Sequence, residues 1–455
     1  MMTVAIALFT ADLRTHDSPV LRGALDAADQ VVPLFVLDEG IRAAGFRTPN
    51  RGAFLAGCLA DLDAALRERG GRLVIRSGDL VREVCRVAEE TGAGQVHVAG
   101  DVSAFAQRRE ERLRAALAGM RRELCVHADA AVVIPPGAIT PADKGHSAVF
   151  TPFFRKWSAA GARRPLGAPR KVSVPDIDSE PPPEAVGLAG GRPSSGLPPG
   201  GETEARRRLK AWLGGPVDRY EDLHDDLAAD ATSRLSPYLH FGCLSPIEVV
   251  HRARQRGGAG AEAFVRQLAW RDFNRQLLAD RPDAARDDYR CRQDRWRPDG
   301  EDAEAWRAGR TGYPLVDAAM RQLVTEGWMH NRGRLITASF LAKTLYVDWR
   351  VGARHFLDLL VDGDVANNQL NWQWVAGTGA ATRPNVVLNP LLQARRFDPK
   401  GDYVRRWVPE LREVEGSAVH RPWLLPGDLR RRLDYPDPIV DLDEALARFR
   451  TGRAA

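Results

Sequence analysis

The feature that most constrains the fold is a change of pattern along the chain. The first part alternates short β-rich runs with amphipathic stretches, whereas helical patterns dominate after about residue 202. The β-rich runs cover residues 4–10, 31–37, 72–77, 95–99 and 123–128, and the helical stretches between them cover 19–28, 51–69, 79–91 and 106–120. Strand–helix alternation at this spacing predicts a doubly wound parallel sheet with right-handed crossovers.

A stretch rich in proline, glycine and serine separates the two patterns. It extends from about Pro135 to Gly201 and is typical of a linker. The aromatic segment 149–157 inside it predicts a short helix that packs on a domain. We therefore expect an α/β domain over residues 1–130, a linker over 131–201 and an all-helical domain over 202–455, which a chain of 455 residues can accommodate.

The composition leaves the partner open and excludes several classes of site. The net charge is +5 and arginine far outnumbers lysine, which is as consistent with a polyanionic partner as with a GC-rich genome. The five cysteines include no Cys-x-x-Cys pair, so we expect reduced thiols and no metal site. No apolar stretch is long enough to span a membrane, and the N-terminal apolar run lacks the basic region of a signal peptide, so we expect a cytoplasmic protein.

The expected sheet lacks the motifs of ordinary nucleotide binding. After the first strand the chain continues as Ala11-Asp-Leu-Arg-Thr-His-Asp-Ser, without a G-x-G-x-x-G sequence, and no Walker-type loop follows. Binding of a dinucleotide or a nucleoside triphosphate by this domain is therefore disfavoured.

The run from Asp362 to Trp374 carries the most chemical information. It reads Asp-Gly-Asp-Val-Ala-Asn-Asn-Gln-Leu-Asn-Trp-Gln-Trp and combines two carboxylates, several carboxamides and two indoles. An apolar core favours Leu, Ile and Val, and a solvated helix face favours Lys and Glu without Trp. The mixture instead suits a large, partly polar, redox-active ring buried inside the helical domain.

A second segment, Thr232-Ser-Arg-Leu-Ser236-Pro237, predicts an anion site. Ser236 is expected to cap a helix that begins at Pro237, and free backbone N–H groups, the helix dipole and an arginine there would suit a diphosphate. An ordinary capped helix is the alternative that the residues leave open. A further capping box, Ser245-Pro-Ile-Glu248, predicts the start of the next helix.

Together these motifs resemble the DNA photolyase/cryptochrome family over nearly the whole chain, and most resemble its class I cyclobutane pyrimidine dimer photolyases. The resemblance implies FAD in the helical domain, with its diphosphate held by the segment 232–236. An arginine–aspartate pair would lie near the isoalloxazine, and Asn368 would face flavin N5, where plant cryptochromes carry Asp. The residues that the resemblance assigns to FAD are Tyr220, Thr232, Ser233, Arg234, Leu235, Ser236, Arg334, Asp362, Gly363, Asp364 and Asn368.

Three tryptophans match the photoreduction chain of the family. Taken alone, they would be interpreted as core or interface aromatics. The resemblance implies that Trp372 lies nearest the flavin, Trp349 in the middle and Trp296 near the surface. The resemblance implies that these three indoles transfer electrons, and with Asn368 they form the expected catalytic set.

Two further tryptophans, Trp270 and Trp374, match the pair that holds a flipped-out dimer between them. A base lesion that leaves the stack needs apolar π faces in place of its former neighbours. The expected lesion and DNA contacts are Gln267, Trp270, Arg271, Asn274, Asn331, Arg332, Trp374 and Gln393. Arginines such as Arg395 and Arg396 could line a phosphate track.

The chain departs from the family pattern at three places. Gln267 stands where many cyclobutane dimer photolyases carry Glu, and glutamine cannot give up a proton at neutral pH. Leu335 replaces a common Met, and the loop from Pro384 to Pro390 lacks an arginine that is often present. Asn331 occupies the place of the second His of (6-4) photolyases, which favours cyclobutane dimers as the substrate.

The α/β domain in this family often binds an antenna chromophore. Folate-binding members carry Asn-Glu where this chain has Gln107-Arg108, and the segment 101–109 resembles the deazaflavin type. We therefore expect 8-hydroxy-5-deazaflavin rather than reduced folate, with an empty pocket as the alternative.

The function that the resemblance implies is light-driven repair of cyclobutane pyrimidine dimers in DNA, by electron transfer from reduced FAD to the flipped-out dimer. The alternative is a cryptochrome-like blue-light photoreceptor, but such proteins usually carry a C-terminal extension and this chain ends soon after Tyr435. A generic flavin oxidoreductase is disfavoured because no NAD(P)H fingerprint occurs. We expect a monomer that acts on damaged DNA.

Overall fold

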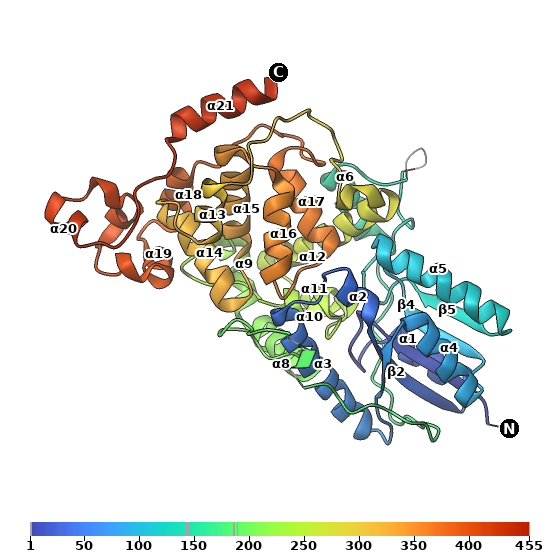
Figure 1. The fold of residues 1–455 in the computed structure, drawn as a ribbon. Coiled ribbons are helices and arrows are strands. Elements are labelled where there is room, and N and C mark those ends of the chain that lie inside the picture. Colours follow the sequence, from blue (N-terminus) through green and yellow to red (C-terminus); the bar gives the residue numbers. More distant parts are fainter. Residues whose placement is uncertain (1, 142–144, 185–186, 189, 455) are drawn as a thin grey trace. The chain divides into compact units, whose positions relative to one another are not determined.

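The computed structural model describes residues 2–141, 145–184, 187–188 and 190–454. Five parallel strands form one sheet in the order β3-β2-β1-β4-β5 (Figure 1). The strands are β1 (Val4–Phe9), β2 (Gln30–Asp38), β3 (Val74–Gly78), β4 (Gln95–Ala99) and β5 (Glu123–His127). Every expected strand is present, so the prediction of a parallel sheet is confirmed. The strand order reverses at β1, where ligands bind in such sheets.

Helices cover both faces of this sheet. Helices α4 (Leu80–Thr91) and α5 (Ala104–Gly119) share one hydrophobic core with alternate strand residues such as Ile6 and Leu8. His97 of β4 points to the opposite face, because Val96 and Val98 belong to that core. Helix α1 (Pro19–Ala27) lies there, and a Cβ atom on its Gly23 would be 2.8 Å from the His97 ring. The sheet is therefore doubly wound, as predicted.

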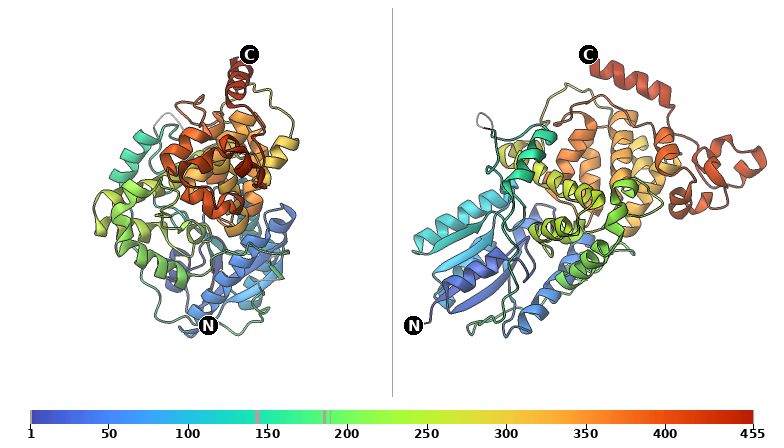
Figure 2. Two further views of the ribbon diagram at one scale, coloured as in Figure 1. Left: turned by 90° about the vertical axis from the view of Figure 1, so that its left-hand side faces the viewer. Right: turned by 180° about the vertical axis from the view of Figure 1, so that it is seen from behind.

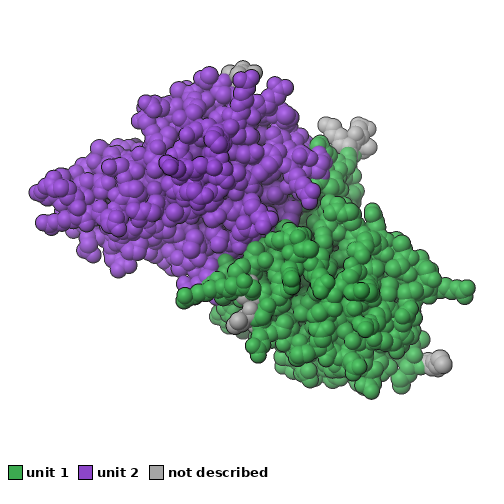
Figure 3. Space-filling model, viewed as in Figure 1, with its two compact units in different colours: residues 1–193, 198–218, 233–282 green, residues 194–197, 219–232, 283–455 purple. Residues whose placement is uncertain are grey.

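The described chain forms two compact units, coloured separately in Figure 3. Unit 1 comprises residues 1–193, 198–218 and 233–282, and unit 2 comprises residues 194–197, 219–232 and 283–455. Some helices that follow residue 201 thus belong to the same compact unit as the sheet, whereas the expected domains were divided in chain order. The remaining helices of unit 1 are α2 (Glu39–Ala43), α3 (Pro49–Arg67), α6 (Phe150–Ala160), α8 (Glu202–Leu213), α10 (Ser236–His240), α11 (Pro246–Arg256) and α12 (Ala259–Asp280).

The aromatic segment inside the expected linker forms α6, which confirms the prediction of a short helix there. Its Phe150, Phe153 and Trp157 are buried. The Trp157 Nε1 donates a hydrogen bond of 2.9 Å to Asp272 of α12. The helix therefore packs on α12 as part of unit 1.

Unit 2 is helical, as expected. Helices α14 to α17 pack side by side around one hydrophobic core (Figure 2). Its α-helices are α9 (Tyr220–Leu223), α13 (Glu301–Arg307), α14 (Pro314–Glu326), α15 (Asn331–Ser339), α16 (Trp349–Leu359), α17 (Val365–Ala376), α18 (Pro390–Phe397), α19 (Asp402–Trp407), α20 (Gly427–Arg431) and α21 (Leu442–Ala454). A π-helical turn, η3 (Phe340–Leu345), follows α15. Among the described residues, every helix is too short or too polar to cross a bilayer.

One of the two expected helix caps is present and the other is not. The Ser245 hydroxyl accepts a hydrogen bond from the Glu248 amide at 3.3 Å, which confirms the start of α11. The prediction that Ser236 caps α10, the helix before α11, is wrong. Leu235 already has helical backbone angles, so α10 begins at Ser236 itself and no side chain caps it.

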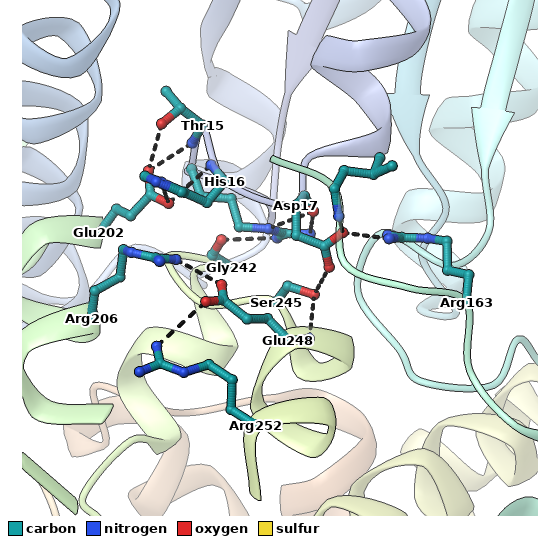
Figure 4. A network of polar contacts seen from close by, with 12 residues as sticks. Thr15, His16, Asp17, Arg163, Glu202, Arg206, Gly242, Ser245, Glu248 and Arg252 are labelled. Carbon is teal, nitrogen blue, oxygen red and sulfur yellow. Dashed lines mark hydrogen bonds and ion pairs between the residues drawn. The ribbon is translucent and has the colours of Figure 1, made fainter. Parts of the chain in front are cut away.

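A buried polar network joins the loop after β1 to helices α8 and α11 within unit 1 (Figure 4). The Glu202 carboxylate accepts hydrogen bonds from the Thr15 amide at 2.7 Å, the Thr15 hydroxyl at 3.0 Å and the His16 amide at 3.0 Å. Asp17 contacts Ser245 and Arg163. These bonds fix the loop on the helices that follow it.

Candidate functional site

The expected arginine–aspartate pair is formed in unit 2. The Arg334 Nη2 lies 2.8 Å from the Asp362 Oδ2, and the Arg334 Nε donates to the Met329 carbonyl at 2.9 Å. Only 3% of the Asp362 side chain is exposed, and its Oδ1 is buried without a hydrogen-bond partner among the described residues. The pair leaves one carboxylate oxygen for a ligand, because a buried anionic oxygen without a donor is unfavourable.

Asp364 and Asn368 position helix α17 beside this pair. The Asp364 carboxylate caps the helix by accepting from the Asn367 amide at 2.8 Å. The Asn368 Nδ2 donates to the Ala353 carbonyl of α16 at 3.0 Å. Gly363, between the two aspartates, is buried. The structure therefore brings Asp362, one of the expected cofactor residues, into contact with Arg334, and it places Asp364 and Asn368 at the start of α17.

The three expected electron-transfer tryptophans belong to one hydrophobic core. Trp372 packs against the backbone of Gly352 in α16, where any side chain would clash with its ring. Trp349, one turn earlier on α16, is fully buried and donates from Nε1 to Asp288 at 2.9 Å. Trp296 is partly buried against the same core. Trp372 and Trp349 are therefore both buried, and Trp296 is the least buried of the three.

Trp296 lies beside the start of α16 because its neighbour Arg297 pairs with Val347 in a parallel β-bridge. The Arg297 amide donates to the Tyr346 carbonyl at 2.8 Å. This bridge joins a segment far away in sequence to the residues just before Trp349.

Whether unit 2 can hold FAD can be judged from its buried polar atoms that have no hydrogen-bond partner. Besides Asp362 Oδ1, the Trp372 Nε1 and the Thr232 Oγ1 are buried without hydrogen-bond partners among the described residues. One is an acceptor, one a donor and one can do both, and a polar ring with a phosphate-bearing tail offers partners of each kind. Tyr220 is also buried, and burial raises the pKa of its hydroxyl. These residues fit FAD.

The expected diphosphate segment passes from unit 2 to unit 1 between Thr232 and Ser233. The Ser233 hydroxyl accepts from the Leu235 amide at 3.4 Å, and Leu235 is buried. Arg234 has a positive φ of 50°, a conformation that is uncommon outside glycine and often occurs at functional sites. Ser236 is exposed at the start of α10.

Four of the expected lesion residues lie on α12 in unit 1, at positions that share one face of a helix. Gln267 is exposed, Trp270 and Arg271 are half-buried and Asn274 is buried. The Trp270 ring stacks on Phe150 with centroids 3.7 Å apart and planes 4° apart. The Arg271 guanidinium donates to the carbonyls of Ala131 and Leu239 at 2.5 and 3.2 Å, so it also holds unit 1 together.

The other four expected lesion residues lie in unit 2. Trp374 is 42% exposed, and Asn331 is exposed at the start of α15. Arg332 pairs with Asp225, with Nε 3.1 Å from Oδ1. Gln393 of α18 has an Oε1 atom that is buried without a partner among the described residues.

Lys343 is a functional candidate that the sequence analysis missed. It is buried in η3, and its Nζ donates to the carbonyls of Pro384 and Val386, both at 2.7 Å. Burial and the charge of Arg453 lower the Lys343 pKa to about 7. Lys343 therefore holds the loop that lacks the expected arginine. A single lysine in the apolar run Phe340-Leu-Ala-Lys-Thr-Leu is the signal that could have revealed it.

Unit 1 contains a cavity of about 210 Å³ at the carboxyl ends of β1 and β2. Open parallel sheets usually bind ligands at this end. The residues that line the cavity are Thr10, Ala11, Phe35, Val36, Leu37, Asp38, Ile41, Phe46, Arg47, Arg51, Gly52, Leu55, Leu188, His240 and Phe241. Gln107 and Arg108, which the antenna prediction used, are not among them.

Comparison with known proteins gives matches over the whole length. Residues 5–172 match the family described as DNA photolyase, and residues 264–454 match the family described as the FAD binding domain of DNA photolyase. A deoxyribodipyrimidine photo-lyase of Streptomyces griseus is 63% identical over 454 residues, which cover 99% of this chain and 99% of that protein.

Solved structures share the fold. A bacterial class III photolyase from Agrobacterium tumefaciens superposes with a TM-score of 0.91 at 33% identity, covering 99% of this chain and 97% of that one. A Synechocystis cryptochrome gives 0.90 at 29% identity, covering 99% and 98%. An archaeal photolyase from Sulfolobus tokodaii with two FAD molecules gives 0.85 at 31% identity, covering 99% and 100%. The chain therefore belongs to the DNA photolyase/cryptochrome family.

Proposed function

We propose that this chain is a deoxyribodipyrimidine photo-lyase that uses light and reduced FAD to split cyclobutane pyrimidine dimers in DNA. The observation that carries the proposal is the buried Arg334–Asp362 pair, with one carboxylate oxygen left for the cofactor, in a chain that is similar over its full length to a protein of that name. The FAD-binding family that matches residues 264–454 includes this pair.

The residues around the cofactor site set its electrostatics. Bound FAD in its reduced form supplies the electron when it absorbs light. Arg334 neutralises the buried Asp362, so the pair holds a hydrogen-bond acceptor in place without a net charge. Asn368 presents a neutral carboxamide that adds no negative charge where the electron is held. Trp372, Trp349 and Trp296 carry an electron inward when the cofactor is oxidised.

The lesion is held by aromatic and amide side chains. Trp270 has one face covered by Phe150, which leaves its other face to stack on an extruded base. Trp374 exposes a large part of its indole, as a second stacking surface requires. Gln267 can donate and accept hydrogen bonds to the dimer but cannot protonate it. Asn331, in place of a histidine, favours cyclobutane dimers over (6-4) products.

Repair is favoured over the photoreceptor alternative. The Synechocystis cryptochrome shares the fold, so the fold alone does not separate the two functions. The much higher identity to the Streptomyces griseus enzyme separates them. Both aromatic residues expected to hold the dimer are also present, at Trp270 and Trp374.

The cavity of unit 1 is the proposed antenna site. Its lining is mainly apolar and aromatic, with Arg47, Arg51 and Asp38 as charged members, which suits a planar chromophore with polar substituents. Gln107 and Arg108 lie outside this lining, so the choice of 8-hydroxy-5-deazaflavin over reduced folate rests on the sequence at 101–109 and not on the cavity. Titration of the purified chain with both compounds tests this assignment. Binding of the folate alone would reverse it.

The test of the function is repair of an oligonucleotide that contains one cyclobutane thymine dimer. The purified protein is loaded with FAD, reduced chemically and incubated with the substrate under blue light and in darkness. Restored thymines only in the light are expected. Photoreducible FAD without restored thymines would instead establish a light sensor.

A further inference from the structure

Four aromatic rings of unit 1 form a row that begins at Trp270, where the dimer is expected to stack. Phe150 stacks on Trp270 with centroids 3.7 Å apart, and Phe154 stacks on Phe150 with centroids 5.7 Å apart and planes 17° apart. Trp157 continues the row, 6.1 Å from Phe154 with planes 22° apart. The last three rings all belong to α6, so this helix lies directly beside the expected lesion contact.

Arg266 of α12 lies over two rings of this row. Its Cζ atom is 4.9 Å from the centroid of Phe150 and 4.8 Å from that of Phe154. A guanidinium is planar and weakly hydrated, so it can lie on aromatic rings while its N–H groups stay available to an acceptor. The rings therefore hold the half-buried side chain in place, which lowers the entropy that a ligand contact would cost.

The N–H donors of Arg266 are unused within the protein. Among the described residues, its guanidinium makes neither a hydrogen bond nor an ion pair. Glu262 precedes it by four residues on α12, a spacing at which acidic and basic side chains often pair, yet the two form no ion pair there. Arg206 and Arg252 of the same unit, by contrast, both pair with Glu248. Arg266 therefore keeps its donors for a ligand from outside the chain.

The helix that faces Arg266 is basic. Helix α6 reads Phe-Thr-Pro-Phe-Phe-Arg-Lys-Trp-Ser-Ala-Ala and contains no acidic residue. Its Arg155 and Lys156 are exposed, and neither forms an ion pair with any residue that the structure describes. Cations without carboxylate partners next to an aromatic contact favour a polyanion. In the proposed function, that polyanion is DNA.

Arg266 lies at a distance from Trp270 that suits the backbone of the bound strand. The two residues are four positions apart on α12, about 6 Å along the helix axis, and such positions are neighbours on a helix surface. A flipped-out dimer stays attached to its own strand, whose phosphates are spaced by about 3.4 Å along a duplex. A phosphate next to a dimer that stacks on Trp270 therefore comes within reach of Arg266.

We propose that Arg266 binds a backbone phosphate of the damaged strand, next to the flipped-out dimer. This role rests on the proposed function, because Trp270 has to hold the dimer for the neighbouring phosphate to lie at Arg266. Phe150 and Phe154 position the guanidinium. Two of its N–H groups can donate to one phosphate, an arrangement that both charge and planarity favour. Arg266 thus adds a contact to those that the resemblance implies.

Arg254 of α11 is a matched control. Its Cζ atom lies 5.5 Å from the centroid of Trp157, so it is also a cation over a ring of this row. It is exposed and forms no ion pair within the described part of the chain. Trp157 is, however, the last ring of the row counted from Trp270. Arg254→Gln and Arg266→Gln remove the same charge from unit 1, so a contact beside the lesion distinguishes them.

The test is binding of the full-length, FAD-loaded protein, in darkness, to an oligonucleotide with one cyclobutane thymine dimer. Fluorescence anisotropy measures the affinity over a range of salt concentrations. Arg266→Gln should weaken binding about fivefold at low salt and lower the slope of log K against log salt by about 0.7 to 0.9, as expected for one lost phosphate contact. Arg266→Lys should keep most of the slope, and Arg254→Gln should match the wild type. Arg266→Met, which still covers the rings, replaces Arg266→Gln if that variant folds poorly.

Neutral methylphosphonate linkages identify the phosphate. The linkages on either side of the dimer are replaced one at a time, and each oligonucleotide is titrated with the wild type and with Arg266→Gln. At one linkage next to the dimer, the neutral group should weaken binding by the wild type but not by the variant, because both changes remove the same contact. At the other linkages the two proteins should respond equally.

Additive losses at every linkage would overturn the phosphate contact. A lower affinity of Arg266→Gln at an unchanged salt slope would also overturn it, because loss of packing alone produces that result. An equal fall in slope for Arg254→Gln would show that Arg266 acts only as a general surface charge. A wild type that binds damaged and undamaged oligonucleotides equally and restores no thymines in the light would instead overturn the proposed function, and the role of Arg266 with it.

Discussion

Glu202 in unit 1 and Asp362 in unit 2 are both buried carboxylates, but their hydrogen bonding differs. Both oxygens of Glu202 are used, by the amides of Thr15 and His16, the Thr15 hydroxyl and the His16 ring. Although burial acts to raise it, these bonds hold the Glu202 pKa below its usual value. Asp362 pairs with Arg334, and its second oxygen has no partner among the described residues. A fully bonded carboxylate indicates a structural role, whereas a half-bonded one indicates a ligand.

The largest change in stability is expected for Glu202→Ala. The substitution leaves two amides and a hydroxyl in unit 1 without an acceptor, so we expect the free energy of unfolding to fall by about 4 kcal/mol. Urea denaturation of the FAD-free protein measures this. Glu204→Ala, on the same helix, removes only partly exposed ion pairs with Arg207 and Arg208 and should cost about 0.5 kcal/mol. Equal losses in the two variants would contradict the structural role of Glu202.

Asp362→Asn should lower FAD affinity more than it lowers stability, the reverse of what is expected for Glu202→Ala. Removing the charge beside Arg334 should weaken FAD binding by about 2 kcal/mol, or roughly 30-fold. The free energy of unfolding of the FAD-free protein should change by less than that, because Asp362 makes one side-chain hydrogen bond. Equilibrium titration with FAD measures the affinity. Asp358→Asn, an exposed partner of Arg354, serves as the control. Unchanged FAD affinity in Asp362→Asn would remove this residue from the cofactor site.

Trp270→Ala tests whether a ligand contact can also lie in unit 1. Loss of one stacking surface should weaken binding of a dimer-containing oligonucleotide by about 1.5 kcal/mol while FAD stays bound. Fluorescence anisotropy at fixed salt measures the affinity. Trp270→Phe retains an aromatic face next to Phe150 and should recover most of the binding. If neither variant changes the affinity, Trp270 serves only to pack against Phe150.

The smallest expected effect is a pH dependence of stability that arises from His97 in unit 1. Burial and the neighbouring His127 lower the His97 pKa from 6.5 to about 4. Between these values the unfolded chain binds a proton that the folded chain does not, so stability should fall as pH drops from 6.5 to 4. Solvent screening around the partly buried imidazole reduces this loss to on the order of 1 kcal/mol. His97→Gln should make this decline shallower in denaturation curves recorded across the range. If the variant loses stability equally over this pH range, titratable groups other than His97 cause the loss.

The sequence allowed the regular elements to be predicted and left most of the long-range pairing open. Alternating apolar residues located every strand, and the Ser245 cap follows from four adjacent residues. The Ser236 cap failed because the conformation of Leu235 depends on its surroundings. Tyr346 and Asp294 are 52 residues apart, and nothing local indicates that a left-handed backbone brings them together. The Arg334–Asp362 pair could be expected only through the family resemblance.

Trp372 and Trp374 on helix α17 allow the most direct test of the claim that the Asp362 run serves a flavin and a lesion. Two residues along a helix turn a side chain by about 200°, and Trp372 is buried while Trp374 is exposed. In matched FAD-loaded preparations, photoreduction and light-driven dimer repair after chemical reduction should be measured for Trp372→Phe and Trp374→Ala. We predict that the first variant loses photoreduction and that the second loses dimer repair while still photoreducing its flavin. Parallel losses in both variants, or normal photoreduction in Trp372→Phe, would contradict the account.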